Sequence, residues 1–132
     1  MNSSDLTEFY LTNIDQLRIA VDLFNVQKWY PAHDAFEEIW HNTNGSERVI
    51  IQSILHIAVA EVHLSNNNKI GATMLYGESL GRLKNKTIPN IGLDIKRFII
   101  IIESRLKALQ NNLELIDLPL PKLAWLKKND LF

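Results

Sequence analysis

The chain has 132 residues and no cysteine, and this absence narrows its chemistry before any motif is considered. Without thiols there can be no disulfide framework, no thiolate metal site and no cysteine nucleophile. A chain without disulfides suits a reducing compartment, so we expect a cytoplasmic protein.

The sequence also lacks an excess of charge of one sign and a long apolar run. Its formal net charge is -1, which gives no overall positive field for non-specific binding to nucleic acid. The N-terminus lacks the basic and apolar segments of a secretion signal, and the longest unbroken apolar run, Phe98 to Ile102, is far too short for a bilayer. We therefore expect neither a nucleic-acid partner nor a membrane partner.

The apolar residues recur every three or four positions, which is the pattern of amphipathic helices. This period predicts an all-α fold: a compact single-domain bundle of about five helices that spans residues 1–132. The expected helices run from Leu6 to Phe24, Pro31 to Trp40, Glu47 to Ser65, Ile70 to Leu83 and, as an additional helix within 92–113, Leu93 to Leu113. Asp5 is a candidate cap of the first helix. The proline-containing tail, 116–132, is expected to dock on the bundle through its leucines and Trp125.

The third expected helix is apolar nearly all round, so it is predicted to lie buried at the centre of the bundle. Three polar residues interrupt it. Gln52, His56 and His63 project within roughly 40° of one another at about 100° per residue, and form a narrow polar seam. Since an unpaired buried amide or imidazole costs about 1–3 kcal/mol, this seam is expected to have partners.

The second expected helix carries the densest group of polar and aromatic side chains. Phe36 and Trp40 fall on its apolar face, whereas His33 and Glu37 lie on the shoulder of that face, one helical turn apart. A short turn makes the second and third helices neighbours, so their polar shoulders are expected to meet in a pocket for a small polar or anionic ligand. The ligand-binding candidates are His33, Glu37, Trp40, Gln52 and His56, with Asp34, Asn25, Trp29, His63 and Asn68 in second rank.

Two other functions remain open on the sequence. His33 with Glu37 could act as a general acid-base pair in a hydrolase, with or without a metal ion. Alternatively, Trp29, Tyr30 and the tail could meet a partner in a helical-hairpin interaction module. The residue pattern leaves open whether any reaction is catalysed, which cofactor is used, and whether the chain forms a homo-oligomer.

The residues present do not favour a metal site. His33 and Glu37 lie in HDAFE, which is not the HExxH pattern because Glu37 stands where the second His would be. The single ExxH, Glu38 to His41, is expected on the solvent side, and a di-iron bundle needs two such motifs plus two more Glu. We therefore expect no physiological metal.

Glycines and basic residues give three smaller predictions. Gly71, Gly77 and Gly81 weaken the fourth helix by up to about 1 kcal/mol each, which suggests close approach of a neighbouring backbone. Gly45 is expected to take a positive φ at the end of the second helix. The basic cluster of Arg82, Lys84 and Lys86 is interpreted as solvated surface at a helix end.

Residues 23–40 set against residues 63–80 show a faint internal repeat at an offset of 40. Ala32 meets Ala72, Phe36 meets Tyr76 and Trp40 meets Leu80. Helical-hairpin repeats produce such a pattern, and so does chance matching of apolar residues.

Three ordered blocks of the sequence resemble a known family, the domain-of-unknown-function family 309, small helical proteins of bacteria and plastids. Its signature reads roughly FNxGxYFEAHExxExxW, then QGLIQxAxAxxH, then GNxxGA. The matching residues within 14–84 are Phe24, Asn25, Trp29, Tyr30, Ala32, His33, Asp34, Glu37 and Trp40, then Gln52, Ile54, Leu55, Ala58, Ala60 and His63, then Asn68, Gly71 and Ala72. The resemblance implies a compact all-helical bundle and carries no established activity.

This chain departs from the family signature at four positions. Gln27 and Ser53 replace glycines, Asp34 replaces Glu, and His56 replaces Gln. Asp34 keeps the charge with a shorter reach. His56 keeps a hydrogen-bonding group but replaces an amide by a titratable ring.

Overall fold

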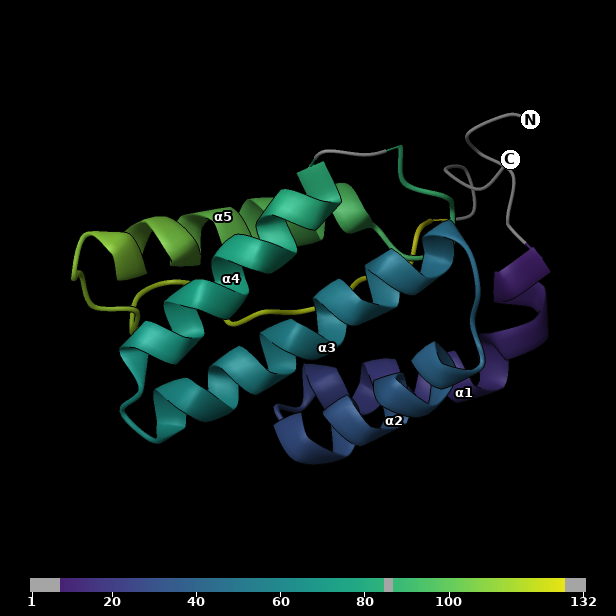
Figure 1. The fold of residues 1–132 in the computed structure, drawn as a ribbon, viewed down its shortest axis with the longest axis horizontal. Helices are drawn as coiled ribbons and strands as arrows, with labels where there is room; N and C mark the ends of the chain where they lie inside the picture. Colours follow the sequence, from purple (N-terminus) through teal and green to yellow (C-terminus); the bar gives the residue numbers. More distant parts are fainter. Residues whose placement is uncertain (1–7, 85–86, 128–132) are drawn as a thin grey trace.

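The computed structural model describes residues 8–84 and 87–127, and within them the fold is all-α (Figure 1). The five helices are α1 (Glu8–Asn25), α2 (Trp29–His41), α3 (Ser46–Ser65), α4 (Lys69–Lys84) and α5 (Ile95–Gln110). The predicted fold class and helix number are therefore confirmed. The cap expected at Asp5, the basic residue Lys86 and the last five residues of the tail lie outside the described residues.

Helix α3 is the central element, as its apolar sequence predicted. It packs against α2 on one side and α4 on the other, while α1 packs on α2 and α5 packs on α4 (Figure 1). By length and composition α3 could also cross a membrane, but 56% of its apolar window is buried inside the protein, as in a core helix.

The chain forms two helical hairpins with the same turn. Gln27 after α1 and Asn67 after α3 both adopt a left-handed backbone, with φ of 62° and 60°. In each turn the next amide donates back to a carbonyl five residues earlier: Lys28 to Leu23 at 3.0 Å, and Asn68 to His63 at 2.8 Å. This is the Schellman arrangement that ends many helices. Gln27 and Asn67 are 40 residues apart, so the faint sequence repeat coincides with two helical hairpins that share one type of turn.

The turn at Gln27 makes a testable prediction, because a left-handed backbone costs a side chain with a Cβ roughly 1–2 kcal/mol. Gln27→Gly should raise the free energy of unfolding by up to about 1 kcal/mol, once the greater freedom of glycine in the unfolded chain is subtracted. Val26→Gly, one residue earlier, should lower it. Urea denaturation of both variants measures the difference. Equal losses in the two would contradict this assignment of strain.

The C-terminal tail docks on the bundle. The Asn25 side chain donates to the Leu123 carbonyl and accepts from the Leu123 amide, both at 2.8 Å. Further along, the Leu126 amide donates to the Gly92 carbonyl at 2.9 Å. The Trp125 ring also lies edge-on to Tyr10, with centroids 6.4 Å apart. The tail therefore contacts α1 near both ends of that helix, at Tyr10 and at Asn25.

A buried ionic network joins α3, α4 and α5. The Arg105 guanidinium donates to both Glu61 carboxylate oxygens at 2.9 and 3.0 Å, to the Tyr76 hydroxyl at 2.8 Å and to the Pro119 carbonyl at 3.1 Å. Tyr76 in turn donates to Glu61 at 2.6 Å. Burial, and next the Glu61 carboxylate, raise the pKa of Tyr76 well above its ordinary value, which keeps the phenol protonated. The period of the apolar residues did not predict this network.

Three local expectations need correction. A Cβ built on Gly77 or Gly81 would meet nothing within 4 Å, so these glycines do not allow close approach of another backbone. The space beside each of these two glycines is open. Gly45 does take a positive φ of 81°, but as the N-cap residue of α3, because α2 has already ended at His41. Helix α5 is shorter than predicted, because Asp94 caps its first turn by accepting from the Arg97 amide.

Gly71 differs from the other two glycines of α4. A Cβ at this position would lie 2.7 Å from Asn68 Nδ2 and 3.2 Å from His63 Cδ2. The close neighbours are side chains and not backbone, so Gly71 makes room for the turn between α3 and α4.

Candidate functional site

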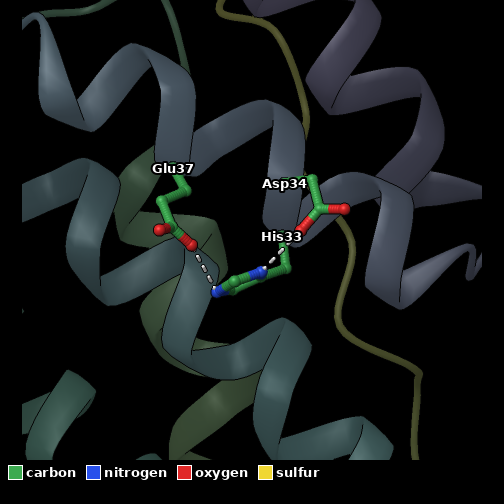
Figure 2. A group of neighbouring side chains, drawn as sticks. All are labelled: His33, Asp34 and Glu37. Atoms are coloured by element: carbon green, nitrogen blue, oxygen red, sulfur yellow. Dashed lines mark hydrogen bonds and ion pairs between the residues drawn. The ribbon is translucent and has the colours of Figure 1, made fainter.

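His33 on α2 contacts two carboxylates. Its Nδ1 lies 3.1 Å from Asp34 Oδ1 and its Nε2 lies 3.1 Å from Glu37 Oε2. Figure 2 shows the ring held between the two carboxylates. The other Glu37 oxygen, Oε1, is 3.4 Å from His41 Nε2, so this carboxylate is shared by two imidazoles. The predicted pairing of His33 with Glu37 is therefore present.

Helix geometry accounts for this arrangement. Glu37 stands four residues after His33, and side chains with that spacing are neighbours on a helix surface. Ala32, Phe36 and Ile39 of α2 are buried in the core, which leaves His33 on the shoulder with 25% of its side chain exposed. The shoulder position predicted for His33 is correct.

His56 reaches the same region from α3. Its Nδ1 is buried and has no hydrogen-bond partner. Burial lowers the pKa of His56, and the positive fields of Arg82 on α4 and His33 on α2 lower it further, against the opposite effect of Glu78 on α4. Helices α2 and α3 pack against each other, as the short turn between them predicted. The meeting of their polar shoulders in a pocket stays a prediction.

We use the name α2–α3 seam for the row formed by Trp40 of α2 with Arg48, Gln52 and His56 of α3. Trp40 and Arg48 form one end of this seam. The Arg48 guanidinium lies over the Trp40 ring, 3.8 Å from its centroid, in cation-π geometry. Trp40 Nε1 and Arg48 Nε are both buried without a hydrogen-bond partner. Arg48 was not predicted. Its signal in the sequence is that it lies one turn before Gln52 and two turns before His56, on the same side of α3.

Gln52 lies between these two groups and is half-buried. Within residues 8–84 and 87–127 its side-chain amide makes no hydrogen bond, although an amide can make up to four. From Arg48 to His56 the seam therefore offers several nitrogen donors that the described part of the chain leaves unused.

Each second-rank candidate has a partner within the protein. Asp34 contacts His33, as described above. Both ends of the Asn25 amide bond the backbone of Leu123. Trp29 packs edge-on against Phe24, with centroids 5.1 Å apart. Asn68 Oδ1 accepts from the Gly71 amide at 3.0 Å, and its Nδ2 lies 3.2 Å from His63 Nδ1. These contacts give Asn25, Trp29, His63 and Asn68 roles in holding turns and helices together.

The α2–α3 region lies within the part of the chain that matches a known family. Residues 17–75 match the model of DUF309, a domain of unknown function. The match confirms the resemblance that the three sequence blocks predicted, and it runs from α1 into α4 through the whole α2–α3 seam. No curated protein sequence matches the chain. The DUF309 name describes no activity, so the chemistry has to be inferred from the side chains.

Within the DUF309 match, His33, Asp34 and Glu37 offer three ligand atoms that lie within 4.8 Å of one another. All three come from one exposed turn of α2, and each carboxylate already hydrogen-bonds or ion-pairs with the His33 ring. Zinc would require these atoms at about 2.0–2.2 Å from one ion. Because nothing beyond the cluster itself indicates a cation, we assign no metal, and the expectation of none stays a prediction.

The lowered pKa of His56 predicts a pH effect. A histidine whose pKa falls on folding contributes stability that is fully present above its unfolded pKa, near 6.5, and is lost as the pH falls below that value. His56→Gln restores the amide of the DUF309 signature and removes the titrating group. We expect the variant to lose less stability than the parent between about pH 7.5 and pH 5, as measured by urea denaturation. His41→Gln, at an exposed histidine, is the control and should follow the parent.

Proposed function

We propose that this protein binds a small anionic ligand along the seam between α2 and α3. One observation supports it: Trp40 Nε1, Arg48 Nε and His56 Nδ1 are all buried there without a partner. Each unpaired buried donor costs about 1–3 kcal/mol, and native proteins leave few of them. Trp40 Nε1 and Arg48 Nε are donors, and His56 Nδ1 is a donor in one of its two neutral tautomers, so the seam favours a ligand that supplies acceptors.

The dimensions of the seam suggest the kind of ligand. Arg48 and His56 are eight residues apart on α3, which corresponds to about 12 Å along a helix. An anion with two or more acceptor groups could therefore contact Arg48 at one end and His56 at the other, with Gln52 between them. Arg48 supplies a permanent positive charge. Glu37 would repel an anion. Its two carboxylate oxygens face His33 and His41, and this pairing weakens the repulsion.

The geometry favours binding over acid-base catalysis by His33. A general base needs a free nitrogen within hydrogen-bond reach of the substrate. Both nitrogens of His33 already face carboxylates at 3.1 Å. The lack of cysteine supports a cytoplasmic location for the binding function.

Citrate is a suitable probe, because its three carboxylates on a short frame match Arg48 and Gln52, which are four residues and about 6 Å apart along α3. We expect citrate to raise the melting temperature saturably, since a ligand that binds only the folded state stabilises it by mass action. Arg48→Gln and Gln52→Leu should each weaken citrate binding about tenfold by calorimetry, a loss of ~1.4 kcal/mol.

Arg97→Gln is the matched control, since Arg97 is an exposed arginine on α5 outside the seam. It should bind citrate as the parent does. If Arg48→Gln and Arg97→Gln reduce the effect of citrate equally, the binding is non-specific charge attraction and the proposal is wrong.

A further inference from the structure

A small cavity lies outside the seam, between the first turns of α3, the end of α4 and the segment that follows residue 86. Its volume is about 60 Å³. The walls are mainly apolar, and Ser46, Arg82 and Thr87 supply the polar groups; the other lining residues are Val49, Ile50, Ile88 and Pro89. An apolar cavity beside a single cation suits an amphipathic ligand.

Arg82 is poorly satisfied in this cavity. Its Nη1 is buried and has no hydrogen-bond partner. Its Nη2 lies 3.6 Å from Glu78 Oε2, in an ion pair whose acid is 53% exposed. Exposed pairs of this kind contribute little to stability, about 0–1 kcal/mol, so Glu78 holds the Arg82 guanidinium only weakly. The interpretation of Arg82 as simply solvated surface does not account for the buried Nη1.

The start of α3 borders the same cavity, where the helix dipole adds positive charge and Glu47 in the first turn offsets part of it. Ser46 opens a 20-residue helix whose N-cap residue, Gly45, provides no side-chain hydrogen bond to the first turn. Free amides at a helix N-terminus carry partial positive charge and bind anionic groups. The cavity therefore combines an unpaired guanidinium nitrogen with an uncapped helix start.

We infer that this cavity is a second ligand site, which takes a short-chain carboxylic acid. The carboxylate would accept from the Arg82 guanidinium, and the apolar chain would lie against Val49, Ile50 and Ile88. A water molecule takes up about 30 Å³ in the liquid, so the cavity holds a chain of about two or three carbons. Phosphate or sulfate fits less well, because the apolar walls leave most of their oxygens unpaired. This inference does not depend on the proposed function of the α2–α3 seam.

Titration with butyrate, followed by NMR, tests the site. We expect saturable shifts of the Val49, Ile50 and Ile88 methyl groups. n-Butanol has a similar apolar chain without the charge and should bind at least tenfold more weakly. Arg82→Gln should weaken butyrate binding about tenfold, whereas Arg97→Gln, which removes an exposed arginine on α5, should leave it unchanged.

A second variant separates the cavity from the charge. Val49→Phe keeps Arg82 but fills the space, so it should also abolish butyrate binding while the circular dichroism spectrum stays helical. Arg48→Gln alters only the seam and should bind butyrate normally, so the failure of one site is distinguishable from failure of the other. Equal binding of butanol and butyrate, full binding by Arg82→Gln, or no saturation by about 50 mM butyrate would overturn the inference.

Discussion

Arg105→Met should lower the free energy of unfolding by about 3–5 kcal/mol, among the largest losses that we expect from a single substitution in this chain. The side chains of Arg105 and Glu61 are only 3% and 6% exposed. Methionine removes every partner that the guanidinium supplies, so Glu61 keeps a buried charge with only the Tyr76 hydroxyl to stabilise it. The Pro119 carbonyl loses its donor as well, which loosens the tail.

Urea denaturation measures this loss, and Arg97→Met at an exposed position of α5 is the matched control, with an expected change within about 0.5 kcal/mol. The double variant Glu61→Leu with Arg105→Met should recover much of the loss, because it removes both buried charges together. Simple additivity of the two single losses would show that the ion pair is not the cause.

Phe24→Ala is the second change with a large expected effect, about 3–5 kcal/mol. Phe24 is fully buried and its ring meets three others edge-on: Trp29 at 5.1 Å, Phe36 at 6.2 Å and Phe98 at 6.0 Å between centroids. These rings come from α2 and α5, so Phe24 joins α1 to both. Alanine leaves a cavity that three large neighbours cannot close.

Thermal and urea denaturation of Phe24→Ala and Phe24→Leu test this role. Leucine keeps most of the volume and should cost much less than alanine. Phe9→Ala is a useful comparison, because Phe9 lies near the start of α1 and is 9% exposed. If Phe9→Ala costs as much as Phe24→Ala, the aromatic cluster gives no special stability.

The fold could be predicted because an amphipathic helix shows as a regular spacing of apolar residues that are close together in the sequence. The period of the apolar residues located all five helices, and the nearly unbroken apolar surface of α3 indicated its central place. The His33–Glu37 contact is also local, since four residues on a helix bring two side chains together. The packing of α2 against α3 followed from one further step, the short turn that makes the two helices neighbours.

Contacts between distant helices could not be located in this way. Glu61 and Arg105 are 44 residues apart, and their pairing depends on how α3 and α5 both meet α4. A signal did exist: each is a charged residue on the apolar side of its helix, and the charges are opposite. Arg48 was missed, and Arg82 was interpreted as solvated surface, for a related reason: a helical pattern does not show which nitrogen of a long side chain becomes buried.

The pair of hydrogen bonds between Asn25 and Leu123 closes a loop of 98 residues. Closing a loop of that length has an entropic cost that grows with its size, and contacts so distant in sequence tend to form after local helices and hairpins. Docking of the tail should therefore be a late step in folding. In the native protein, amide hydrogen exchange at Leu123 should then report local detachment of the tail at a lower free energy than exchange in the core of α3.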